Sequence, residues 1–137
     1  MDQKFALRPY KNNYYVRFSY TGPSIRLERG SQASGRVEVL YDGIWGTVCD
    51  YQWDIADAVV VCHYLGYPGA SWFTSGGNYG EGTGPVWMSE VQCTGSETRL
   101  QECDQVQDWG DNECDHKRDA GVVCVPSKPF IHPLNKC

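Results

Sequence analysis

Cysteine is the residue type with the clearest chemical message in this 137-residue chain, which holds seven of them. Six lie in its middle and later parts: Cys49, Cys62, Cys93, Cys103, Cys114 and Cys124. They are never closer than ten positions, whereas zinc sites use paired thiolates at short spacing. We therefore expect disulfides and an oxidising compartment. The odd total leaves one cysteine without a partner inside the chain.

The other reactive side chains form no catalytic pattern. His63 falls on an expected helix, His116 lies near Asp119, and His132 lies near the end. No serine or free cysteine stands with a histidine and an orienting acid in a recognisable motif. No pair of carboxylates is singled out for glycoside hydrolysis, and the glycines of residues 74–84 fit no phosphate-binding loop. The sequence thus predicts that the chain is not an enzyme.

Charge is distributed unevenly along the chain. Residues 1–23 hold four basic side chains against one acidic one, and the remainder holds eight basic against sixteen acidic. An acidic body argues against nucleic acid as the main partner. It suits cations or basic ligands, although solubility alone would also favour it. No apolar run is long enough to span a bilayer, and the start resembles no signal peptide, so we expect a fragment of a larger protein.

Short strands are the elements expected to position the cysteines. Alternation of apolar and polar residues predicts strands near 25–30 and 36–41. Asp42-Gly43 then marks a hairpin, because both central residues of such a turn need positive φ. Later strands are expected within 86–93 and 121–125, separated from the earlier ones by an irregular glycine-rich turn.

One main helix is predicted to begin at Ile55, with Asp54 as its N-cap and Gly66 as its stop. An apolar stripe at helical spacing places Cys62 on the buried face: Ile55, Ala58, Val59, Cys62 and Leu65. Ser96 is expected to cap a short second helix that ends near Cys103. The sequence therefore predicts an α+β fold.

Several motifs together resemble one known family. They include GRVEV at 35–39, GIWGTVCD at 43–50, WD at 53–54, LGY at 65–67, GTGPVW at 82–87 and DAG at 119–121. From about Ile25 to Val125 the chain resembles the scavenger receptor cysteine-rich (SRCR) domain, in its six-cysteine, group A form. The resemblance implies a small disulfide-rich fold with a curved antiparallel sheet cradling the helix. It divides the chain into an N-terminal extension (1–23), the domain (24–125) and a C-terminal linker (126–137).

The resemblance also implies a pairing of the cysteines, which the residues alone leave open. The implied pairs are Cys49–Cys114, Cys62–Cys124 and Cys93–Cys103. Cys137 lies outside the pattern, so we expect it to be unpaired or linked to a neighbouring domain or a second copy of the chain.

Two calcium sites of the family can be compared with this sequence. The first needs two consecutive aspartates and a third acidic residue, and here only Asp50 is kept, since Tyr51 and Arg118 stand at the other positions. We expect this site to be lost, with an Asp50–Arg118 pair in its place; the alternative is two solvated charges. At the second site, Glu90 and Glu113 are weak candidate Ca²⁺ ligands, and the alternative is a solvated acidic loop.

The function that the resemblance implies is extracellular ligand binding, by a scavenger or pattern-recognition receptor of innate immunity or by a secreted SRCR protein. Its partner would be a protein or a polyanionic microbial surface, bound through loops on a rigid scaffold. If no cation bridges to an anionic ligand, the candidate binding residues are Arg8, Lys11, Arg17, Arg26 and Arg29. The rivals are a non-catalytic accessory domain of an extracellular enzyme (a mosaic serine protease or lysyl oxidase-like protein) and an adhesion or structural module.

Overall fold

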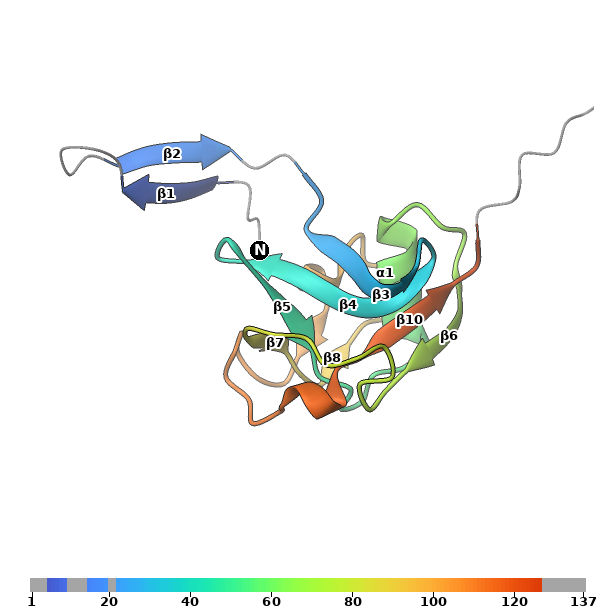
Figure 1. The fold of residues 1–137 in the computed structure, drawn as a ribbon. Coiled ribbons are helices and arrows are strands. Elements are labelled where there is room, and N and C mark those ends of the chain that lie inside the picture. Colours follow the sequence, from blue (N-terminus) through green and yellow to red (C-terminus); the bar gives the residue numbers. More distant parts are fainter. Residues whose placement is uncertain (1–4, 10–14, 20–21, 127–137) are drawn as a thin grey trace, which may run out of the picture.

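The computed structural model describes residues 5–9, 15–19 and 22–126 (Figure 1). In chain order the elements are β1 (Phe5–Pro9), β2 (Tyr15–Ser19), β3 (Ile25–Ser31), β4 (Ser34–Tyr41), β5 (Ile44–Val48), α1 (Ile55–Tyr64), β6 (Ala70–Thr74), β7 (Val86–Met88), β8 (Val91–Gln92), the 3-10 turn η2 (Leu100–Glu102), β9 (Asp104–Gln105), the 3-10 turn η3 (His116–Arg118) and β10 (Gly121–Cys124). Within these residues, no helix is long and apolar enough to cross a membrane.

A curled sheet packed against one main helix forms the body of the domain (Figure 1). Its strand order is β6-β10-β4-β5-β7, with β3 paired to β4, and α1 packs against β10 and β6. The predicted α+β fold is confirmed. One detail was wrong, since the sheet is not wholly antiparallel: β7 runs parallel to β5. The strands β1 and β2 form a separate antiparallel hairpin.

The hairpin between β4 and β5 forms where Asp42-Gly43 predicted it. Asp42 and Gly43 have φ values of 54° and 75°, and Tyr41 faces Ile44 across the turn. Because both central residues take positive φ, the turn matches the right-handed twist of the two strands. The hairpin fixes the register of β5, which leads directly to Cys49.

Both ends of α1 lie where the sequence predicted them. Ala58 and Cys62 are buried as predicted, but the rest of the buried face differs from the predicted stripe. Asp54 is the N-cap, and Gly66 follows the helix with a φ of 95°. Val60 and Val61 are fully buried, whereas Ile55 is 43% exposed. Since residues 58–62 are all apolar, periodicity alone could not decide which neighbouring stripe would face the sheet.

The buried face of α1 includes a carboxylate. Asp57, in the first turn of α1, is fully buried and closes a capping box with Asp54. Its two oxygens accept hydrogen bonds of 2.9 Å from the backbone N–H groups of Asp54 and Cys93. Burial raises the pKa of Asp57 to about 7, against the opposing effect of these hydrogen bonds. Asp57 thus ties the start of the helix to the loop around Cys93.

The expected second helix is only a three-residue 3-10 turn, η2, and Ser96 does not cap it. The Glu97 side chain accepts hydrogen bonds from the backbone N–H groups of Thr94 and Gly95, which folds these residues into a loop. These bonds lower the pKa of Glu97, the bond from Thr94 most strongly. Because residues 94–97 form this loop, the helical turn begins only at Leu100.

The core joins the helix, the sheet and the cysteines. Its buried members are Ile25, Val37, Val39, Val48, Trp53, Ala58, Val60, Val61, Cys62, Met88, Val91, Leu100, Cys103, Ala120, Val122 and Cys124. Three disulfides connect Cys49 to Cys114, Cys62 to Cys124 and Cys93 to Cys103, the pairing that the family resemblance implies. Cys137 and the expected linker from residue 127 onward lie outside the described residues.

Candidate functional site

The Cys49–Cys114 disulfide brings two distant loops together. Cys49 follows β5 and Cys114 precedes η3, and the two cysteines are 65 positions apart in the chain. As a result, the backbone N–H of Asp50 donates to the carbonyl of Arg118 at 2.8 Å. Residues after the first cysteine of the domain therefore lie beside residues before β10.

Asp50 and Arg118 form an ion pair at this junction. The Arg118 Nε group donates to Asp50 Oδ1 at 2.9 Å, and the Gly76 N–H donates to Asp50 Oδ2 at 2.6 Å. The Asp50 side chain is 5% exposed and that of Arg118 is 46% exposed. The guanidinium also lies 4.1 Å from the centre of the Tyr51 ring. The guanidinium of Arg118 thus lies beside Asp50, in the pair that the sequence predicted for these two residues.

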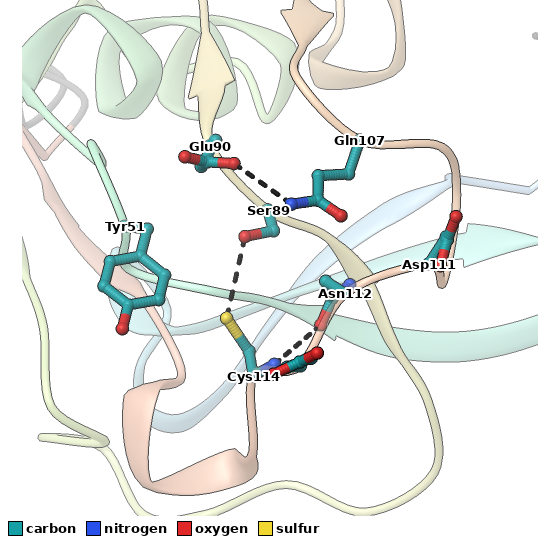
Figure 2. A pocket seen from close by; sticks show the side chains of 8 residues that line it. Tyr51, Ser89, Glu90, Gln107, Asp111, Asn112 and Cys114 are labelled. Carbon is teal, nitrogen blue, oxygen red and sulfur yellow. Dashed lines mark hydrogen bonds between the residues drawn. The ribbon is translucent and has the colours of Figure 1, made fainter.

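Tyr51 also lines a hollow with a cavity volume of about 450 Å³, the acidic pocket. Its lining residues are Tyr51, Ser89, Glu90, Gln107, Asp111, Asn112, Glu113 and Cys114. Figure 2 shows Gln107 reaching toward Glu90 and the Ser89 hydroxyl toward the Cys114 sulfur, contacts of 3.4 and 3.6 Å. Glu90 has a φ of 55°, an uncommon backbone conformation for glutamate. We call Tyr51, Arg118 and the acidic pocket together the Tyr51 face.

Glu90 and Glu113, the two candidate calcium ligands, both line the acidic pocket. Within the described part of the chain, three metal-ligating side chains come close together only at Cys93, Glu97 and Cys103. Two of these are joined in a disulfide, so that group is a structural cross-link. The acidic pocket holds oxygen donors of the type that Ca²⁺ prefers, but not drawn together as a closed ligand set.

A hydroxyl, a histidine and a carboxylate do meet on the sheet, although not as a catalytic triad. His116 Nδ1 lies 3.0 Å from Asp119 Oδ2 and 3.3 Å from Thr47 Oγ1. A triad needs the hydroxyl and the carboxylate on opposite ring nitrogens, and here Nε2 is bonded to the Gly84 carbonyl at 2.8 Å. This group has a structural role: Asp119 also accepts from the Gly82 N–H and so anchors the glycine-rich loop.

Of the five candidate anion-binding residues, the structure describes the side chains of Arg26 and Arg29 only. Arg26 is held between Glu38 and Glu28 at 2.8 and 3.4 Å, and its guanidinium lies 4.2 Å from the centre of the Trp45 ring. Arg29 is exposed at the end of β3, Arg8 lies in β1, and Arg17 in β2. Lys11 lies outside the described residues.

A buried ion pair near Arg26 escaped the sequence analysis. Arg36 and Glu38 are both buried and lie 3.0 Å apart, and Arg36 also donates to the carbonyls of Tyr79 and Gly80. The two residues alternate with Val37 and Val39 on β4. A strand with one solvent-exposed face shows the same sequence pattern. In the structure both are buried, and the hydrogen bonds of Arg36 hold the glycine-rich loop.

Comparisons with known proteins bear directly on this fold. A model of the scavenger receptor cysteine-rich domain matches residues 27–125. The third SRCR domain of murine neurotrypsin is 45% identical, with a TM-score of 0.69 over 75% of this chain and 96% of that one. The SRCR domain of mouse MARCO, solved in a dimeric form, is 43% identical, with a TM-score of 0.62 over 67% of this chain and 86% of that one.

Proposed function

Because the chain belongs to the scavenger receptor cysteine-rich family, we propose that it is a binding module that recognises a protein ligand through its Tyr51 face. Domains of this family are generally non-catalytic modules of extracellular proteins or ectodomains, and three disulfides agree with that setting. We further assign it to the six-cysteine, group A form, because all six cysteines within residues 22–126 are paired in three bridges.

The observation that carries the proposal is the position of the Tyr51 face on a rigid frame. Tyr51 is 49% exposed; it contacts the Arg118 guanidinium and lines the acidic pocket. Binding sites are commonly formed by loops held on a cross-linked scaffold, and tyrosine and arginine are enriched among the residues that dominate protein interfaces. An accessory role in a larger extracellular enzyme, or in adhesion, would use the same face. Cys137 would provide a covalent link to a neighbouring domain or chain.

The test is affinity capture from extracellular fluid and cell surfaces. We expect the native chain to capture a discrete protein saturably. The control is the same chain after reduction and alkylation of its cysteines, which removes the bridges and leaves the sequence unchanged. Equal capture by the native and the reduced chain, or no saturable capture at all, would count against the proposed function.

We also propose that the acidic pocket binds Ca²⁺ through Glu90 and Glu113. Millimolar affinity, as in other extracellular modules, is expected because the carboxylates line the pocket without a closed ligand set. Calorimetric titration of the full chain with CaCl₂ should release or absorb heat, and the Glu90→Gln and Glu113→Gln variants should lose it. The matched control is Asp104→Asn, which removes an exposed carboxylate outside the pocket. The absence of heat at millimolar Ca²⁺ would refute the site.

A further inference from the structure

Arg118 is a surface arginine that the structure holds in one position. Its Nε is bonded to Asp50, whose other oxygen is bonded to the Gly76 backbone N–H. Since Asp50 is almost fully buried, the guanidinium is anchored to the body of the domain. Most exposed arginines lose side-chain freedom when they bind a ligand, and this anchoring reduces that cost.

The terminal nitrogens of Arg118 remain available. Its side chain is 46% exposed, and only the Nε of its guanidinium takes part in the hydrogen bonds found among the described residues. One face of the guanidinium is covered by the Tyr51 ring at 4.1 Å. The planar fork of terminal N–H groups matches a carboxylate in two parallel hydrogen bonds. Lys117, the exposed neighbour on η3, adds a second positive charge.

The geometry points to Arg118 as the anchor for a carboxylate of a protein partner, bound directly and without a bridging calcium ion. Asp50 fixes the guanidinium, and Tyr51 provides a flat wall beside the incoming acidic side chain. This inference rests on the proposed function, because it names the chemistry of the ligand at the Tyr51 face.

The surrounding charge favours a peptide segment with a single carboxylate over a polyanionic polymer. Residues 22–126 carry six lysines and arginines against sixteen aspartates and glutamates, and three of these acids line the acidic pocket beside Tyr51: Glu90, Asp111 and Glu113. A sulfated polysaccharide would bring repeated negative charge against this surface and be repelled. A protein segment can present one carboxylate to Arg118 and neutral or basic groups to the acids.

The experiment titrates the full ¹⁵N-labelled chain, in EDTA, with a short glycine-serine peptide that contains a single glutamate. We expect a saturable shift of the Arg118 Nε–Hε signal, and no shift with the peptide in which glutamine replaces glutamate. Arg118→Gln and Tyr51→Ala should each weaken binding by about tenfold, the loss expected when a residue that dominates an interface is truncated. The matched controls are Arg29→Gln, which removes the same charge elsewhere, and Tyr51→Phe, which keeps the ring; both should stay within about twofold of wild type.

Several results would overturn the inference. Equal binding of the glutamine peptide, or equal loss in Arg29→Gln and Arg118→Gln, would show that Arg118 is not the anchor. Binding of heparin at Arg118 without binding of the glutamate peptide would assign the site to polyanions. If the Arg118→Gln variant does not fold, the peptide affinity of the Tyr51→Ala variant tests the inference, because that substitution leaves the Asp50–Arg118 pair in place. Capture of an extracellular protein by both native chain and Arg118→Gln would refute this inference and leave the proposed function intact.

Discussion

Replacing Cys62 and Cys124 together by alanine is expected to lower the free energy of unfolding by about 4 kcal/mol. The bridge joins α1 to β10 across 62 positions, and both sulfurs lie in the core. Without it, the unfolded chain gains the freedom that closure of this long loop removes. Denaturant unfolding of the oxidised double variant, followed by tryptophan fluorescence, measures the loss.

The matched control is the Cys93→Ala, Cys103→Ala double variant. That bridge spans only 10 positions, so the same loop-closure argument gives a smaller loss of about 3 kcal/mol. The order of the two variants is the diagnostic result. A larger loss from the short bridge would show that local packing, and not restriction of the unfolded chain, governs the contribution of these disulfides.

Replacing Asp57 by alanine is expected to cost about 3 kcal/mol, because two partly buried backbone N–H groups then lose their acceptor. These are the N–H groups of Asp54 and Cys93. The control Asp54→Ala removes the exposed half of the same capping box and should cost only about 1 kcal/mol. Chemical unfolding of the three proteins compares them, and equal costs would contradict the role of Asp57 as a link between the helix and the Cys93 loop.

The stability of the domain should also depend on pH through Asp57. Its pKa is raised by burial from 3.8 to about 7 in the folded chain, so between these values the folded state holds a proton that the unfolded state has released. The stabilisation is therefore complete below about pH 4 and is lost as the pH rises to about 7. The advantage of wild type over Asp57→Asn should shrink across this interval; a constant difference would contradict it.

Local signals predicted the parts of the fold that depend on neighbouring residues. Asp42-Gly43 predicted the hairpin, and Asp54 and Gly66 predicted the two ends of α1. Strand β6 was missed, because its Ser71-Trp72-Phe73 run lacks a clear alternation and gains its place by pairing with β10. The buried face of α1 was predicted only in part: Ala58 and Cys62 are buried, but so is Asp57, while Ile55 is exposed. A carboxylate is expected to face solvent until its tertiary hydrogen bonds are known.

The same division applies to the candidate site. Comparison with the family pattern predicted an Asp50–Arg118 pair, and the structure contains that ion pair at 2.9 Å. The family pattern did not predict the packing of the Tyr51 ring against the Arg118 guanidinium. It also did not predict the hydrogen bonds that link Asp119 and Arg36 to the glycine-rich loop. These contacts join residues far apart in sequence, so they depend on side-chain geometry that spacing does not encode.

The most direct test of the proposed binding role is hydrogen exchange of the domain with and without the captured partner protein. Partner binding should slow exchange at backbone amides of the Tyr51 face: residues 50–51, 89–90 and 111–118. The same amides should remain unprotected when the partner is mixed with the reduced and alkylated chain. Protection confined to the exposed edge at β6 or to β3, with the Tyr51 face unchanged, would contradict the proposal.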